Sequence, residues 1–293
     1  METVRLRLDL AYDGTAFSGW SSQPGLRSIQ GVIDEALAVL MRHPKHDVRL
    51  VVAGRTDAGV HATGQVVHVD VSAARWRALS AARRGGTAEQ SFARRMNGII
   101  GGRSGDVVIS RVSIAAAGFD ARFSPIWRRY EYRIADASSA RDPRRRSHTL
   151  WHTGHLDVGA MDAAARSLTG LHDFAAFCKP RERATTIRTL LEYGWSRDEH
   201  GVLVAAVRAD AFCHSMVRSL VGGAVAVGLG TLEPQQLSQI LTDAVKANAF
   251  PVVAAKGLTL VEVGYPADAE VGARAALTRA RRTPMDPAVD PLD

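Results

Sequence analysis

The sequence predicts an α+β protein (mixed α/β) built from two tandem halves, each with the element order β-α-β-β-α-β. Runs of alternating apolar and polar residues are typical of half-buried strands, and they are separated by segments with apolar residues at helical spacing. This order of elements occurs once before residue 115 and again after residue 116. Such a split β-α-β order predicts ferredoxin-like halves, with antiparallel-rich sheets that join around a central cleft.

The first half, residues 1–115, opens with a strand over 4–10, where leucines and valine alternate with charged residues. Ser28 is expected to cap a helix over 29–40, and Pro44 ends that helix. The remaining predicted elements are strands over 48–53 and 65–71, a helix over 88–100 and a strand over 107–114. The segment 75–91 is polar and rich in alanine and arginine, and it is interpreted as an insert without a clear period.

The second half, residues 116–266, repeats the order with one extra helix and a longer loop. Its predicted elements are strands over 128–134, 186–196, 201–210 and 257–263, and helices over 157–168, over 214–228 and from Pro234 onward. Beyond residue 266 no apolar period continues, so 267–293 is predicted to be a disordered tail.

The charge of the chain favours a polyanionic partner. The formal net charge is +7 with a sequence pI of about 9.9, and residues 121–146 hold eight arginines against three acids. Arginine outnumbers lysine 33 to 4, which a bias in genomic base composition would also produce. Clustering together with net charge favours nucleic acid. The duplicated sheet is also of the kind that RNA-recognition modules use.

Several other classes of protein lack support in the sequence. No apolar run approaches the length that spans a bilayer, and the N-terminal residues resemble no secretory signal, so we expect a cytoplasmic protein with no membrane partner. Cys178 and Cys213 are far apart and give no disulfide framework or zinc ribbon. Histidines 148, 152 and 155 have no supporting ligand context, so no metal is expected.

The most unusual motif is "AGRTDAGVHATGQ", residues 53–65, on the loop between two predicted strands. It places Asp57 between Gly54 and Gly59, with Arg55 before it and His61 after it. Glycines allow tight bends and the close approach of another chain. Taken alone, this motif is more typical of a turn than of an active site.

Two residues of the second half add to a chemical interpretation, although each has a structural alternative. Tyr130 follows two arginines on a strand, where a ring can stack on a base or simply fill the core. Arg218 lies off the apolar stripe of its helix, where it can pair with a buried carboxylate or cap the surface. A carboxylate kept ionised in this way is a nucleophile or a base. Together with the basic charge, these features favour a base-modifying enzyme.

The motif "AGRTDAGVHATGQVVH" closely resembles the catalytic motif of the tRNA pseudouridine synthase A family. The resemblance continues through "YDGTAFSGW", "RSIQGVIDEAL", "FDARFSPIWRRYEYRI", "LTGLHDFAAFC", "TIRTL", "ADAFCHSMVRSLVG" and "AKGLTLVEVGYP". It covers roughly residues 4 to 266. The chain departs from the family pattern at Ser21, in "MNGIIGGRSGD", in segment 75–91 and in the tail.

The resemblance implies a role for five residues. Asp57 would be the catalytic aspartate and Arg218 its ion-pair partner. Tyr130 would stack on the target uracil, and Leu258 would form an apolar wall of the base pocket. Arg55 would lie near the flipped nucleotide and help to hold the RNA open.

The resemblance also implies the reaction and the partners. The uridine C1′–N1 bond breaks, the uracil rotates and a C1′–C5 bond forms, with no cofactor, metal or nucleotide required. The substrate would be the anticodon arm of tRNA at positions 38, 39 and 40, bound by a homodimer. Whether Asp57 attacks C1′ or C6, or acts mainly as a base, stays open.

Two other classes of function remain as alternatives. A non-catalytic RNA chaperone would bind tRNA with steep salt dependence and leave the nucleoside unchanged. A glycoside or nucleoside hydrolase usually needs two cooperating carboxylates, and it would release free uracil.

Overall fold

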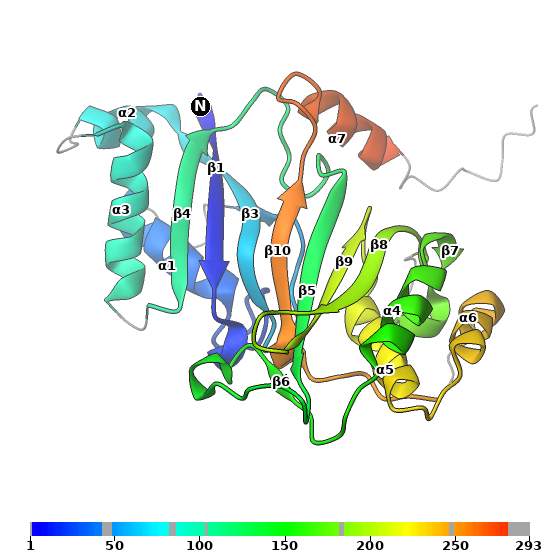
Figure 1. The fold of residues 1–293 in the computed structure, drawn as a ribbon. Coiled ribbons are helices and arrows are strands. Elements are labelled where there is room, and N and C mark those ends of the chain that lie inside the picture. The colour runs from blue at the N-terminus through cyan, green and yellow to red at the C-terminus, as the bar shows by residue number, and fades with distance from the viewer. Residues whose placement is uncertain are drawn as a thin grey trace, which may run out of the picture.

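A computed structural model of the chain describes residues 2–42, 49–81, 86–102, 105–181, 185–245 and 249–280. A ten-stranded, mostly antiparallel sheet runs through these residues, with helices beside both ends of it (Figure 1). The strands are β1 (Thr3–Tyr12), β2 (Leu50–Val52), β3 (His61–Ser72), β4 (Val107–Ile114), β5 (Trp127–Ala135), β6 (Leu150–Trp151), β7 (Gly170–Asp173), β8 (Ile187–Arg197), β9 (Leu203–Ala209) and β10 (Leu258–Gly264). The α+β class predicted from the sequence is confirmed.

The two halves share one sheet, and β10 lies at the junction. The strand order is β4-β1-β3-β10-β5-β9-β8-β7, with β2 paired to β3 and β6 paired to β5. β10 runs parallel to β3, with Thr259 opposite His61, and antiparallel to β5, with Leu260 opposite Tyr130. Because parallel neighbours begin at the same end of a sheet, the loops that precede β3 and β10 meet there.

Most of the helices form two groups, one beside each half of the sheet, and the last helix lies apart from both, beyond the end of β10 (Figure 1). The helices are α1 (Ile29–Met41), α2 (Ala73–Ala81), α3 (Ala88–Gly101), α4 (Val158–Ser167), α5 (Met216–Gly228), α6 (Pro234–Asp243) and α7 (Val271–Ala280). The Ser28 side chain accepts a hydrogen bond from the Gly31 N–H at 3.2 Å and so caps α1. The chain leaves α1 at Arg42, which has left-handed backbone geometry, and Pro44 lies outside the described residues.

One helix was missed within the segment interpreted as an insert. α2 occupies Ala73–Ala81, and its Trp76 is buried with its ring 5.8 Å from that of Phe92. The buried residues of this helix are Ala73 and Trp76, and two apolar positions are too few to show a helical period. The short strands β6 and β7 were also missed, because two to four residues carry too little alternation to be recognised.

The prediction of a tail over 267–293 is wrong for residues 271–280, which form α7. Val271 and Ala275 are each 1% exposed, and the Ser124 hydroxyl donates to the Val271 carbonyl at 2.9 Å. Arg279 also pairs with Asp120. A few small apolar residues thus anchor a helix that is otherwise polar, and residues 281–293 lie outside the described residues.

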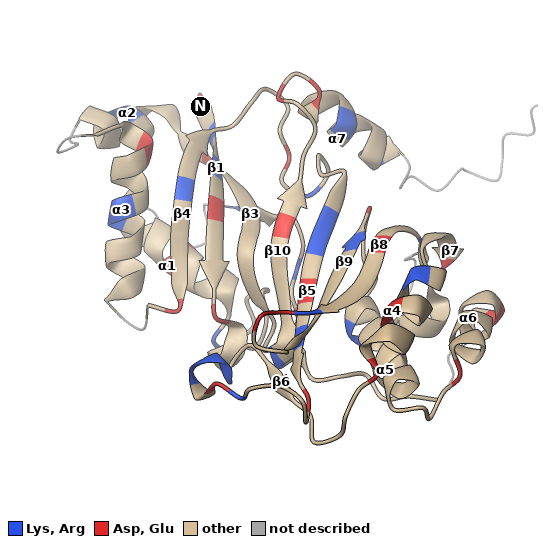
Figure 2. Cartoon of the chain, viewed as in Figure 1, with Lys and Arg blue, Asp and Glu red and all other residues tan. Residues whose placement is uncertain are grey.

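The charged residues are unevenly placed on the sheet. Figure 2 shows basic residues on β5 and on the loops at the lower end of the sheet, where the segments before β3 and β10 also lie. Part of the excess positive charge of the chain, formally +7, is therefore gathered near that end of the sheet.

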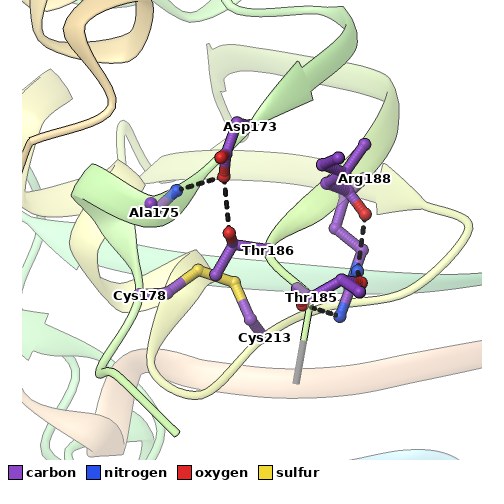
Figure 3. Close-up of a disulfide and its surroundings, with 8 residues drawn as sticks. Asp173, Ala175, Cys178, Thr185, Thr186, Arg188 and Cys213 are labelled. Atoms are coloured by element: carbon purple, nitrogen blue, oxygen red, sulfur yellow. Dashed lines mark hydrogen bonds between the residues drawn. A yellow bond between two sulfur atoms is a disulfide. The ribbon is translucent and has the colours of Figure 1, made fainter. Parts of the chain in front are cut away.

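The two cysteines form a disulfide, although their spacing in the sequence gave no sign of a disulfide framework (Figure 3). Cys178 and Cys213 are 35 residues apart in sequence, but their Cα atoms are 5.8 Å apart. The adjacent Lys179 N–H donates to the His214 carbonyl at 2.9 Å. The bridge therefore ties the segment just before α5 to the 3-10 turn at Ala175–Phe177. Sequence separation alone gave no signal of this contact.

The described ranges contain neither a membrane-spanning helix nor a cluster of metal ligands. None of the helices there is long and apolar enough to cross a membrane. Among the same residues, no three His, Cys, Asp or Glu side chains are grouped as metal ligands. The His148 ring lies against His61, with centroids 6.5 Å apart, while His155 Nδ1 is 2.9 Å from the Ser138 hydroxyl.

Candidate active site

The loop that carries Asp57, residues 53–60, is held in place by buried hydrogen bonds on its inner side. The Tyr12 hydroxyl and the Thr56 Oγ1 are 2.8 Å apart, and Trp20 N–H donates to the Thr56 carbonyl at 3.0 Å. Gln65 Nε2 donates to the Gly54 carbonyl at 2.8 Å and to the Tyr12 hydroxyl at 3.2 Å. Buried polar groups with satisfied partners fix local geometry. The residue before Asp57 is therefore fixed although Asp57 itself is not buried.

Two glycines let the chain take this path. Gly59 has a φ of +77°, and a Cβ there would lie 3.4 Å from the Ala255 Cβ, just before β10. Gly19 has a φ of +97°, and a Cβ there would lie 3.1 Å from the Thr56 carbonyl oxygen. Side chains are disfavoured at such φ values. The glycines thus bring the 53–60 loop against the turn that precedes β10 and against the segment that precedes α1.

The Asp57 carboxylate faces two basic side chains of the second half. Arg218 Nη1 lies 3.7 Å from Asp57 Oδ2, and His214 Nε2 lies 3.5 Å from Asp57 Oδ1. Arg218 is oriented by its Nε, which donates to the Val253 carbonyl at 2.8 Å. A single carboxylate of the first half therefore meets the start of α5 across the junction between the halves.

The carboxylate differs from the buried one expected from the sequence, because the Asp57 side chain is 35% exposed. Exposed ion pairs are screened by water and contribute at most about 1 kcal/mol to stability. Both basic groups are also beyond direct hydrogen-bond distance. The arrangement thus leaves one side of Asp57 open to a ligand.

Tyr130 and Leu258 lie on adjacent strands beside this loop. Tyr130 is opposite Leu260, and Leu258 is opposite Tyr132, so the register places Tyr130 and Leu258 on the same face as diagonal neighbours. Both are buried, at 8% and 6% exposure. The ring of Phe212 meets that of Tyr130 edge-on, with centroids 5.1 Å apart.

Burial raises the pKa of the Tyr130 phenol to about 12, Arg128 lowers it and the negative charge of Asp57 raises it further. The phenol is therefore neutral at physiological pH. Its contribution to a site would be the face and edge of a ring rather than a phenolate.

Arg55 lies two residues before Asp57 on the same loop, and it is exposed. The structure thus brings Asp57, Arg55 and Arg218 to one junction, with Tyr130 and Leu258 on the neighbouring strands.

Sequence reasoning missed three residues near the site. His214 contacts Asp57, Phe212 packs on Tyr130, and Arg128 Nη2 donates to the Ala53 carbonyl at 2.8 Å. Arg128 Nη1 also donates to the Asp210 carbonyl at 3.0 Å, so it links the Asp57 loop to the segment before α5. All three lie within motifs that resemble the family, but their spacing in sequence does not reveal these contacts.

Comparison with known proteins identifies the family. A family profile described as tRNA pseudouridine synthase matches residues 164–266. The chain is 54% identical to tRNA pseudouridine synthase A of Leifsonia xyli subsp. xyli over 96% of this chain and 99% of that one. The chain belongs to the tRNA pseudouridine synthase A family.

Further relatives agree over the same length. Identity is 49% to tRNA pseudouridine synthase A of Streptomyces avermitilis, covering 96% of this chain and 94% of that one. It is 52% to the protein of that name from Frankia casuarinae, covering 97% of each chain. The chain is therefore an enzyme of the pseudouridine synthase kind, and the α+β fold agrees with that family.

Proposed function

We propose that this enzyme converts uridine to pseudouridine at positions 38, 39 and 40 of the tRNA anticodon arm, with Asp57 as its catalytic group. The names of the relatives support tRNA as the substrate. The observation that carries the proposal is the partly exposed Asp57 carboxylate, held 3.7 Å from Arg218 at the junction of the two halves.

The reaction needs one group that attacks or removes a proton close to the ribose. The C1′–N1 bond breaks, the uracil turns, C1′ bonds to C5, C5 loses its proton and N1 gains one. Substrate and product are isomers, so no outside group, redox cofactor or metal enters the balance. Asp57 supplies the carboxylate, as a nucleophile toward C1′ or C6 or as a base on the sugar.

Arg218 and His214 hold the position of Asp57 when a base covers it. In the free protein water screens the pair, because Asp57 is 35% exposed. A uridine flipped out of a helix would displace that water, and the arginine would then keep the carboxylate ionised in a less polar setting.

The apolar part of the site would hold the flipped base. Tyr130 and Leu258, neighbours on β5 and β10, supply a ring and an aliphatic wall for the uracil. Arg55, exposed on the loop beside Asp57, would fill the place of the displaced nucleotide or contact its phosphate.

The proposal extends to the organisation of the protein. Residues 1–115 would present the catalytic loop, residues 116–266 would complete the base pocket, and two copies of the chain would form a homodimer that binds each tRNA with both subunits. A tRNA substrate supports a cytoplasmic location. Fractionation of cells that express the full chain would test that location, and recovery of the chain in the membrane or secreted fraction would reject it.

The test uses the full chain and an unmodified tRNA transcript with uridines at positions 38, 39 and 40, in buffer containing a chelator. We expect pseudouridine at those positions, and none when each uridine is replaced by cytidine. Modification at other positions only would reject the anticodon-arm specificity. Tight binding of tRNA without any pseudouridine would instead support the RNA chaperone, and free uracil would support a hydrolase.

A further inference from the structure

A second concave site lies beside β6, outside the Asp57 region. Its volume is about 350 Å³. Its floor and walls come from the loop after β5, from β6 and from the turn between β8 and β9, and its lining includes Arg141, Asp142, Arg144, Arg145 and Trp151. We call it the β6 pocket. Pockets of small-molecule size begin at about 300 Å³, so it can hold one nucleotide.

The charge of the β6 pocket is positive, with three lining arginines against one lining aspartate. The Arg144 side chain is 88% exposed, and its Nη2 lies 2.8 Å from Asp142 Oδ2. Arg145 lies between two carboxylates, with its Nε 3.9 Å from Asp142 Oδ2 and its Nη1 3.8 Å from Asp198 Oδ2. Figure 2 shows the basic residues of this loop gathered beside β6. Such a surface suits a phosphate, because a phosphate carries more negative charge than the Asp142 carboxylate that the arginines now share.

The pocket also contains an exposed aromatic ring. Trp151 is 39% exposed, and the Arg141 guanidinium carbon lies 5.5 Å from its ring centroid. Arg141 is held there by a hydrogen bond from Nη2 to the His152 carbonyl at 3.0 Å. Proteins that bind unpaired nucleic acid combine basic grooves with rings on which bases stack.

The loop that lines the pocket also reaches the Asp57 region. His148, which follows the arginines, has its ring 6.5 Å from that of His61, at the start of β3. Asp57 lies four residues before His61 on the same loop-to-strand segment. An RNA bound at Asp57 therefore has a basic, aromatic surface next to it along the same end of the sheet.

We propose that the β6 pocket binds one unpaired nucleotide of the RNA, with its base against Trp151 and its phosphate between Arg144 and Arg145. It is a second RNA-binding site that adds affinity and fixes the position of the RNA relative to Asp57, and it takes no part in the chemistry there. The proposal rests on the proposed function only in taking that RNA to be the tRNA substrate.

The test measures the dissociation constant of the full chain for a tRNA transcript at several salt concentrations. Arg144→Glu should weaken binding by about tenfold or more and reduce the slope of log affinity against log salt by about one. Trp151→Ala should weaken binding by about five- to 150-fold, and Trp151→Phe should restore most of the loss. The matched control is Arg166→Glu on α4, because Arg166 is 72% exposed and pairs with Asp162 at 2.7 Å.

Wild-type affinity and salt slope in both Arg144→Glu and Trp151→Ala would overturn the proposal. Equal weakening by Arg166→Glu would also overturn it, because overall charge would then explain the loss. Free UMP is the second probe; if it binds through Trp151 while the variants leave tRNA binding unchanged, the pocket belongs to a small nucleotide instead. Binding is measured without turnover, so a chain that binds tRNA through this pocket but forms no pseudouridine contradicts only the proposed function.

Discussion

Replacing Arg218 by methionine removes the charge that faces Asp57 while it keeps most of the volume of the side chain. In the structure Arg218 Nη1 is 3.7 Å from Asp57, and its Nε donates to the Val253 carbonyl at 2.8 Å. The substitution therefore removes one screened ion pair and one partly buried hydrogen bond.

The two losses have different sizes. The ion pair contributes less than about 1 kcal/mol to stability because Asp57 is 35% exposed. A hydrogen bond from a charged donor contributes about 1.5–3 kcal/mol. We expect Arg218→Met to lower the free energy of unfolding by about 2–3 kcal/mol. The rate of the chemical step should fall by about 100-fold or beyond, which exceeds what the screened ion pair contributes to stability, because a bound base excludes the water that screens the pair.

The assay is single-turnover formation of pseudouridine in a tRNA transcript, beside tRNA affinity and urea unfolding of the same proteins. Arg5→Met is the matched control, since Arg5 also pairs with a carboxylate, Asp70, and donates to a backbone carbonyl, that of Phe119, each at 2.7 Å. Arg5→Met should lose stability and keep the single-turnover rate. If Arg218→Met kept a rate within about tenfold of wild type, or lost tRNA affinity as strongly as rate, the reasoning would be wrong.

Three further predictions follow from the structure. Tyr130→Phe should keep activity within about tenfold, because burial keeps the phenol neutral and the ring is retained, whereas Tyr130→Ala should lose about five- to 150-fold; equal losses in single-turnover assays would reject the ring as the active part. Burial and the charge of Arg5 lower the pKa of His68 to about 4, and its Nδ1 accepts from the Ala121 N–H at 2.9 Å. As the pH falls, His68 is therefore protonated in the unfolded chain before it is protonated in the folded one. Its contribution to the free energy of unfolding is full above about pH 6.5 and should fall by about 3 kcal/mol toward pH 4. His68→Gln should remove this fall, and the same dependence of the free energy of unfolding on pH in both proteins would contradict the prediction. Cys213→Ser should lower the free energy of unfolding of the oxidised protein by about 3–4 kcal/mol, since the bridge closes a 35-residue loop, and added reductant should have no further effect on the variant; equal stability of oxidised wild type and variant would refute it.

The elements with strong periods could be predicted from the sequence. The alternation Leu6, Leu8, Leu10 predicted β1, and each of these leucines is fully buried. α1 was marked by its Ser28 cap and its apolar stripe. By contrast, α2 and α7 are each anchored by one or two buried residues, such as Trp76 and Val271. So few apolar positions form no periodic pattern, and these helices could not be predicted from the sequence.

The neighbourhood of Asp57 could be predicted only in part. The motif drew attention to Asp57, and the resemblance to the family pointed to Arg218. Contacts that depend on the folded path were not accessible: His214 reaches Asp57 because the chain turns just before α5, where Ser215 has left-handed geometry. The disulfide between Cys178 and Cys213 is of the same kind, since a separation of 35 residues says nothing about distance in space.

The central claim is that Asp57 is the catalytic group of the enzyme. Asp57→Asn changes one partly exposed carboxylate to an amide of equal size, so the fold and tRNA binding should persist. Mapping pseudouridine in a tRNA transcript incubated with each protein tests the claim most directly. We predict pseudouridine in the anticodon arm with wild type and none with Asp57→Asn at equal tRNA occupancy. Pseudouridine formed at the wild-type rate by Asp57→Asn would contradict the account.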